Sequence, residues 1–129
     1  MAKLNLPKEA RLKFKAARDF IKERDVSAAR AELLKIELGS SYSLFHRMLA
    51  ACALIAKDFD LAVSHIEQSI ALDPDKQVLI ADAIRIYQAK GDKDRSNQWS
   101  KSFDLNKTES SSELLRVALA LKSLSNYSE

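Results

Sequence analysis

The fold is decided by residues 49–74, which read LAACALIAKDFDLAVSHIEQSIALDP. Apolar residues recur every three or four positions on both sides of a short polar segment at 57–60, which is the spacing of an amphipathic helix. The Asp-Pro pair at 73–74 then ends one helix and starts the next, since proline suits a first helical turn. The stretch therefore predicts a pair of antiparallel helices over residues 43–57 and 60–72.

The same pattern recurs on both sides of this stretch with a period of 33 residues. Small residues coincide at Ala17, Ala50 and Ala83, and the polar segments coincide when residues 24–33 and 90–99 are aligned with 57–66. We expect these alanines to let the helices of each pair approach closely. The three predicted pairs occupy about residues 7–40, 41–73 and 74–107. Their helices are expected at Pro7–Glu23, Val26–Leu38, Ser43–Lys57, Asp60–Leu72, Asp75–Lys90 and Lys93–Leu105.

Residues at the helix ends agree with these boundaries. Gly39 and Gly91 are expected in left-handed closing positions, and Asp60 is expected to cap its helix. A stack of helix pairs also needs a cover for its last apolar face. Residues 110–127 are expected to form that capping helix. Its apolar stripe comprises Leu114, Leu115, Val117, Ala118, Leu119, Leu121 and Leu124.

The composition supports one all-α domain over residues 1–129. Hydrophobic residues make up 47% of the chain and charged residues 30%, with only two glycines and two prolines. This excludes a disordered chain and disfavours a sheet of many short strands. A single cysteine excludes an internal disulfide framework. A single cysteine also fits a reducing compartment, so we expect a cytoplasmic location. The longest mostly apolar run, residues 48–56, is far shorter than the roughly twenty residues of a membrane span, so we expect no membrane span.

Positive charge is concentrated at the N-terminus. The chain carries a net charge of +3, and residues 1–24 hold eight cations and three carboxylates. The cations are Lys3, Lys8, Arg11, Lys13, Lys15, Arg18, Lys22 and Arg24. Such a helix either anchors nucleic acid, anionic lipid or an acidic protein segment, or is a solvated face with local ion pairs. We favour the solvated face.

The second helix pair resembles the tetratricopeptide repeat. That repeat has tryptophan, leucine, glycine, tyrosine, alanine, phenylalanine and proline at fixed spacings. In the second pair these positions hold His46, Leu49, Ala50, Ala53, Ala62, Ile66 and Pro74. Leucine, alanine and proline are therefore kept, Ala50 replaces the glycine, and other residues replace the aromatic ones. The third pair matches less well. Its corresponding residues are Leu79, Asp82, Ala83, Ile86, Arg95, Trp99 and Lys107. The period of 33 also departs from the family's 34. The resemblance implies a right-handed α-solenoid of antiparallel helix pairs.

In this family the first helix of each pair lines a concave groove that binds an extended peptide or a partner helix. The positions carried over are Phe14, Arg18, Ile21, Leu44, Arg47, Ala51, Leu54, Gln77, Ile80, Ala81, Ile84 and Tyr87. We select as site residues Phe14, Arg18, Ile21, Arg47, Leu54, Ile84 and Tyr87. The alternative is that several of these side chains are core. The set is mostly apolar, so the expected partner is an apolar peptide or amphipathic helix with an acidic edge for Arg18 and Arg47.

The resemblance implies a non-enzymatic protein–protein interaction module, of adaptor, scaffold or chaperone-like type. Two alternatives stay open: an accessory interaction domain of a larger enzyme, and a binder of nucleic acid or an anionic surface through the basic first helix, with nucleic acid disfavoured. A homodimer is also open. We predict no catalytic residue, no metal and no cofactor. His46 and His65 lack a third ligand, and Cys52 lies among alanines as a packed thiol does.

Overall fold

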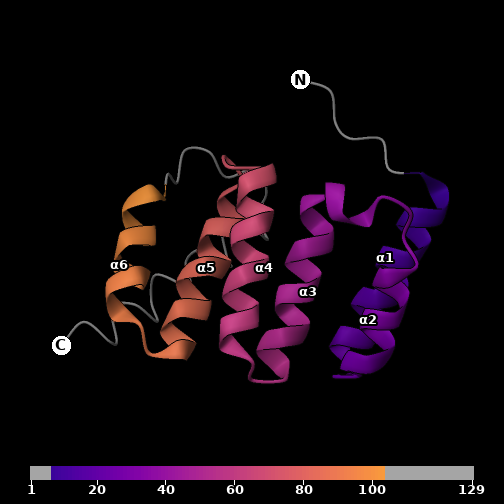
Figure 1. The fold of residues 1–129 in the computed structure, drawn as a ribbon, viewed down its shortest axis with the longest axis horizontal. Coiled ribbons are helices and arrows are strands. Elements are labelled where there is room, and N and C mark those ends of the chain that lie inside the picture. Colours follow the sequence, from indigo (N-terminus) through magenta and orange to yellow (C-terminus); the bar gives the residue numbers. More distant parts are fainter. Residues whose placement is uncertain (1–6, 104–129) are drawn as a thin grey trace.

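The computed structural model describes residues 7–103, which fold into α-helices and one short 3-10 helix (Figure 1). The elements are α1 (Lys8–Lys22), α2 (Val26–Leu34), η1 (Gly39–Ser41), α3 (Ser43–Ile55), α4 (Phe59–Leu72), α5 (Gln77–Lys90) and α6 (Lys93–Ser102). No strand occurs among these residues, so the all-α prediction is confirmed for the described part of the chain. The expected capping helix at 110–127 lies outside it.

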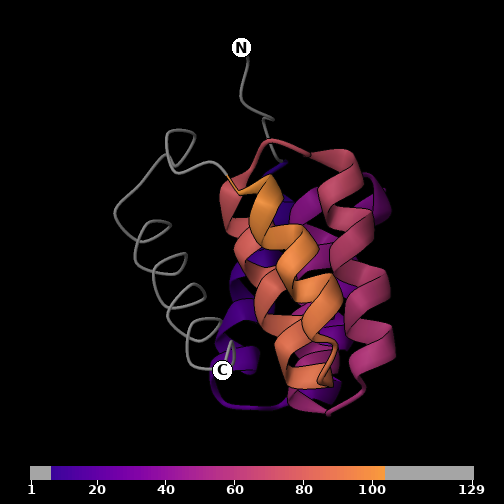
Figure 2. The same ribbon diagram turned by 90° about the vertical axis from the view of Figure 1, so that its left-hand side faces the viewer.

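The helices form three pairs in chain order. Helix α1 packs on α2, α3 on α4, and α5 on α6, and the two helices of each pair run side by side in opposite directions (Figure 1). Helix α4 also packs on α5, which joins the second pair to the third. Turned by 90°, the molecule shows α6 in front and α4 along one side (Figure 2). The predicted pairing of helices is therefore present in the described residues.

The same turn joins the helices of all three pairs. An aspartate caps the second helix: Asp25, Asp58 and Asp92 accept a hydrogen bond from the backbone N–H three residues later, at 3.1, 3.2 and 3.0 Å. Their own N–H groups donate to the carbonyls of Phe20, Ala53 and Tyr87, at 2.9, 2.8 and 2.9 Å. The residue before each aspartate has a left-handed φ, at Arg24 (66°), Lys57 (62°) and Gly91 (89°). The cap of α4 is thus Asp58, and the prediction of Asp60 was wrong.

The turns also correct the repeat period. Asp58 follows Asp25 by 33 residues, but Asp92 follows Asp58 by 34. The alignment of Lys90 with Lys57 was therefore wrong by one residue, because the sequence comparison matched one cation with another while the left-handed turn residue is Gly91. The shift changes which residues correspond. The counterpart of the buried Ala62 is Ser96, which is also buried and donates from its hydroxyl to the carbonyl of Ile84 at 3.3 Å.

Several small residues of the helices are completely or almost completely buried. Ala17, Ala29, Ala53, Ala62 and Ala83 have no exposed surface, and Ala50 is only 2% exposed. A larger side chain at these places would overpack the contact between helices. The core around them is aliphatic. Its largest cluster comprises Ala50, Ala53, Ala62, Ile66, Ile70, Val78, Leu79, Ala83 and Ile86.

The two glycines are used differently. Gly91 has the left-handed φ that the sequence predicted, whereas at the end of the first pair this conformation belongs to Leu38 (φ 56°) and not to Gly39. Gly39 is instead buried against Phe45. A Cβ atom on Gly39 would lie 2.8 Å from Cδ1 of that ring. Helix α2 ends at Leu34, four residues before its predicted end at Leu38, and residues 39–41 form the 3-10 helix that leads into α3.

Candidate binding groove

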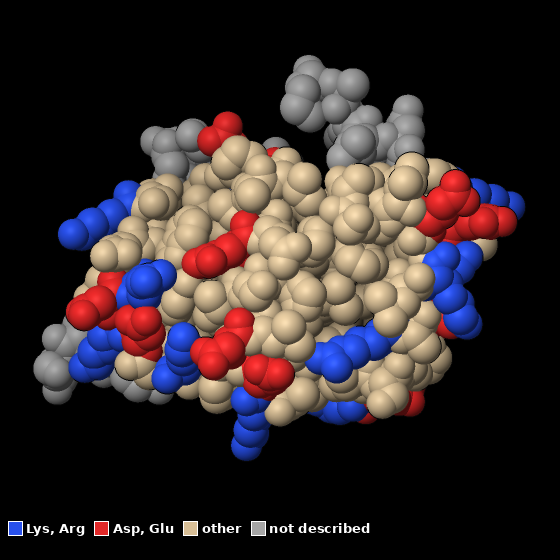
Figure 3. All heavy atoms as spheres, viewed as in Figure 1, with Lys and Arg blue, Asp and Glu red and all other residues tan. Residues whose placement is uncertain are grey.

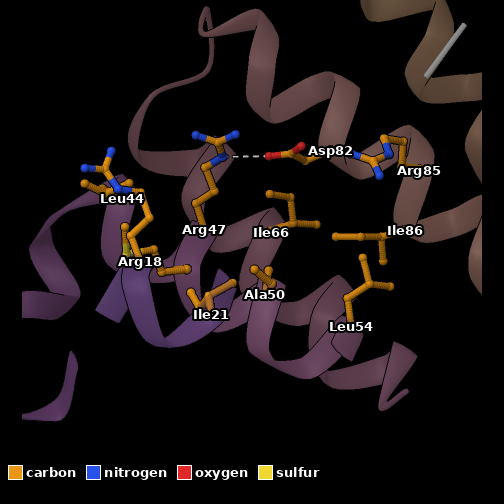
Figure 4. Close-up of a pocket in the computed structure, with 12 residues that line it drawn as sticks. Arg18, Ile21, Leu44, Arg47, Ala50, Leu54, Ile66, Asp82, Arg85 and Ile86 are labelled. Carbon is orange, nitrogen blue, oxygen red and sulfur yellow. Dashed lines mark hydrogen bonds and ion pairs between the residues drawn. The ribbon is translucent and has the colours of Figure 1, made fainter. Parts of the chain in front are cut away.

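A cavity of about 240 Å³ lies between the first helices of the three pairs. Helices α1, α3 and α5 form its walls, and α4 contributes one residue. The described residues that line it are Arg18, Ile21, Leu44, Arg47, Met48, Ala50, Ala51, Leu54, Ile66, Asp82, Arg85 and Ile86 (Figure 4). Three helices that are distant in the sequence thus meet at one apolar hollow, which we call the groove.

The groove has an apolar side and a charged side. In Figure 4 the charged ends of Arg18, Arg47, Asp82 and Arg85 lie along one edge, and aliphatic side chains lie along the other. The aliphatic residues labelled on that side are Ile21, Ala50, Leu54, Ile66 and Ile86, while Leu44 lies beside the end of Arg18. Such a surface matches a ligand that is itself amphipathic, with one apolar face and one polar edge.

An ion pair crosses the groove from α3 to α5. Nε of Arg47 donates to Oδ2 of Asp82 at 2.7 Å, and the two side chains are only 23% and 12% exposed. The short distance and low exposure make this a charge-assisted hydrogen bond stronger than an open surface pair. It fixes the position of Arg47 and holds the walls formed by α3 and α5 in register.

The other two arginines are available to a ligand. Arg18 and Arg85 are exposed, and neither guanidinium forms an ion pair or a hydrogen bond with another residue of 7–103. Asp82 is the one acidic side chain among the described lining residues. The edge of the groove therefore carries an excess of positive charge that can attract a carboxylate.

Equivalent positions of the three pairs meet in the groove. Counted back seven residues from the capping aspartates, the positions are Arg18, Ala51 and Arg85, and all three line it. Alanine at the central position leaves the hollow open between two arginines. The groove thus follows from the repeat once the correct spacing is used.

Four of the seven selected site residues line the groove, namely Arg18, Ile21, Arg47 and Leu54. Two further carried-over positions, Leu44 and Ala51, line it as well. The remaining three selected residues are buried elsewhere and are not in the lining.

Phe14, Ile84 and Tyr87 lie in the core. Phe14 packs edge-on against the ring of Tyr42, with centroids 6.1 Å apart. Ile84 belongs to a cluster with Ile80 and Ala81 on α5. The Tyr87 hydroxyl donates to the Glu67 carboxylate at 2.5 Å, and burial together with this carboxylate raises the pKa of Tyr87.

The register error explains why α5 was misassigned. The 33-residue period placed Ile84 opposite Ala51, whereas the structural counterpart is Arg85. One residue along an α-helix rotates the side chain by about 100°, which exchanges a groove position for a core position. The signal that could have found Arg85 is the Gly91-Asp92 pair, which repeats the left-handed residue and cap of Lys57-Asp58.

The two histidines stack between α3 and α4. Their ring centroids are 6.2 Å apart, and Nε2 of His46 lies 2.9 Å from the carbonyl oxygen of Ser40. Burial lowers the pKa of His65, and the neighbouring His46 and Arg30 lower it further. Neither histidine lines the groove.

Cys52 is buried, and burial raises the pKa of its thiol. A buried thiol of raised pKa is a poor nucleophile at neutral pH. Within residues 7–103 no group of three or more His, Cys, Asp or Glu is arranged to hold a metal ion.

Comparison with known proteins adds no relative: no protein-family model matches the chain, and no curated protein matches it. Over residues 7–103, no helix combines the length and the apolar character that crossing a membrane requires. The resemblance to the tetratricopeptide repeat therefore depends on the residues and turns described above.

Proposed function

We propose that the chain is a small tetratricopeptide-like right-handed solenoid that acts as a non-enzymatic protein–protein interaction module. The groove between α1, α3 and α5 is its binding site, and a peptide or partner helix is its ligand. The corrected spacing supports this proposal, because the second step of 34 residues equals the period of that family.

The observation that carries the proposal is the groove itself. An apolar hollow sits beside the exposed guanidinium groups of Arg18 and Arg85, which form no ion pair with another residue of 7–103. Concave, mostly apolar surfaces with a few placed polar groups are typical binding sites. The groove contains no described histidine, cysteine or hydroxyl side chain, so its chemistry suits recognition of a partner.

The test blocks the groove at its centre. Ala51→Phe places a ring in the hollow from a half-buried position, and Ala71→Phe makes the same change at an exposed position of α4 outside the lining. Wild type and both variants are compared in affinity capture at low and moderate salt, with thermal melts to show that each is folded. Tyr87 is unsuitable as a groove substitution because it is buried and bonded to Glu67.

A protein that is retained at moderate salt by wild type and Ala71→Phe, but not by Ala51→Phe, supports the proposal. Equal retention of every captured protein by both variants contradicts a groove function. Retention of nucleic acid alone, with no effect of Ala51→Phe, moves the function to the surface of α1.

A further inference from the structure

A continuous stripe of cations follows the exposed side of α1. Lys8, Arg11, Lys15, Arg18 and Lys22 recur with spacings of three and four residues, and all five are exposed. None of them forms an ion pair or a side-chain hydrogen bond with another residue of 7–103. These five cations therefore lie along one side of α1 without an ion pair to another residue of 7–103.

The stripe borders the groove. Arg18 lines the groove, and 3.6 residues per turn place Arg11, Lys15 and Lys22 within about 60° of it around the helix axis. On one side of Arg18 lie the buried residues of α1, such as Phe14. The stripe therefore meets the groove at Arg18 and continues from there over the exposed side of α1.

On the face that Figure 3 shows, positive and negative side chains are mixed. In the view of Figure 3, Lys and Arg lie next to Asp and Glu near α5 and α6, and the surface over α3 and α4 is mostly uncharged. A row of five exposed cations, without an ion pair to another residue of 7–103, therefore begins beside the apolar hollow at Arg18. Its field attracts a partner with the opposite charge along one edge.

We infer that the groove takes an acidic amphipathic helix, whose apolar face packs on Ile21, Leu54 and Ile86 while its acidic edge faces the α1 stripe. This inference rests on the proposed function and specifies the partner's chemistry. The aliphatic lining favours a protein helix over nucleic acid, because the described lining holds no aromatic side chain on which a base could stack.

The probes are three synthetic helical peptides of about 18 residues, which is long enough for partial helicity in water. All carry leucines at three- and four-residue spacing, and the flanking edge carries Glu, Gln or Lys. A duplex DNA is the fourth probe. Affinities for the full chain are measured by fluorescence anisotropy at low and moderate salt.

Two charge-reversed variants have the same net charge. Lys15→Glu with Lys22→Glu reverses part of the stripe, and Lys93→Glu with Lys101→Glu reverses two exposed lysines of α6. We expect the Glu peptide to bind at least about tenfold more tightly than the Gln peptide at low salt. We expect the affinity for the Glu peptide to fall about tenfold in the stripe variant and to change little in the α6 variant. The reason is that charges at the rim of a binding site mainly change the association rate constant.

The outcomes separate the inference from the proposed function. Equal affinity for the three peptides, abolished by Ala51→Phe, overturns the acidic partner and leaves the groove function intact. Equal losses of affinity for the Glu peptide in the stripe and α6 variants also overturn it, because binding then depends only on the net charge of the chain. DNA binding that the stripe variant loses and Ala51→Phe keeps overturns it in favour of nucleic acid. Failure of wild type to bind any peptide overturns it, while the capture experiment tests the groove independently.

Discussion

Gly39→Ala tests the junction that places α3, and hence half of the groove lining, against the first helix pair. In wild type the ring of Phe45 lies against the Cα of Gly39. An added Cβ would lie 2.8 Å from Cδ1 and 2.9 Å from Cε1 of that ring, and 3.4 Å from Cβ of Ile36. Favourable carbon–carbon separations are about 3.5–4.0 Å, so the buried ring must move by about 0.7 Å.

The expected cost follows from two opposing effects. Overpacking of a filled core costs about 1–3 kcal/mol, while replacing glycine by alanine restricts the unfolded chain and returns about 0.4–1 kcal/mol. We therefore expect a net loss of about 1–2 kcal/mol in the free energy of unfolding. For a domain of this size the melting temperature falls by about 3–5 °C for each kcal/mol. Urea denaturation and thermal melts followed by circular dichroism measure both quantities.

A double-mutant cycle identifies the cause. Phe45→Leu removes ring atoms next to Gly39, so the combined variant should lose less stability than the sum of the single changes, by at least about 0.5 kcal/mol. Gly91→Ala is the control, because Gly91 has a left-handed φ and no atom within 4 Å of an added Cβ. It should cost about 1 kcal/mol through backbone strain alone and show no coupling to Phe45→Leu. Additive losses at Gly39 and Phe45 would refute the steric explanation.

Three further predictions concern the turns, the charged residues and pH. Asp58→Ala should lower stability by about 1 kcal/mol through loss of the cap, and Asp60→Ala should cost less in the same urea titration; the reverse order would contradict the corrected cap. Arg47→Met should cost about 1–2 kcal/mol, because it removes a charge-assisted hydrogen bond to Asp82, and an unchanged melt would show that the pair contributes nothing. In the folded chain the pKa of His65 lies below its ordinary value of 6.5, so the unfolded chain binds a proton more readily and stability falls as the pH drops below about 6.5. His65→Gln should therefore reduce the change in the urea midpoint between about pH 8 and pH 5. An unaltered change of the midpoint with pH would show that His65 is not its source.

The sequence predicted the paired helices because its local signals were consistent. Apolar spacing, small residues and chain breakers all indicated the second pair, and the bounds of α3 and α4 differ from the predicted ones by at most two residues. The register of the third pair could not be read in the same way. Its turn differs in residue type, with Gly91 where the other turns have Arg24 and Lys57, and a match by charge aligned Lys90 instead.

The spacing of apolar residues also could not predict which side of α5 faces the groove. Most of its residues are buried, including Ile80, Ile84 and Tyr87, so no narrow apolar stripe marks the side that faces its neighbours. A helix that is apolar nearly all round gives no directional signal. Helix α5 contributes Arg85 to the groove lining and Asp82 to the hydrogen bond with Arg47. Both depend on how α5 is rotated about its own axis, which only the three-dimensional structure shows.

The charge of the groove is a consequence of repeat register more than of overall composition. Seven residues before each cap, the pairs carry Arg18, Ala51 and Arg85, so an open centre lies between two exposed cations. With a second step of 33 residues that position on α5 would be Ile84, and the edge would lose one of its two exposed arginines. One added residue in the third pair therefore converts an apolar hollow into one with positive charge at both ends. That arrangement favours a partner helix, which is long enough to reach both arginines, over a compact ligand.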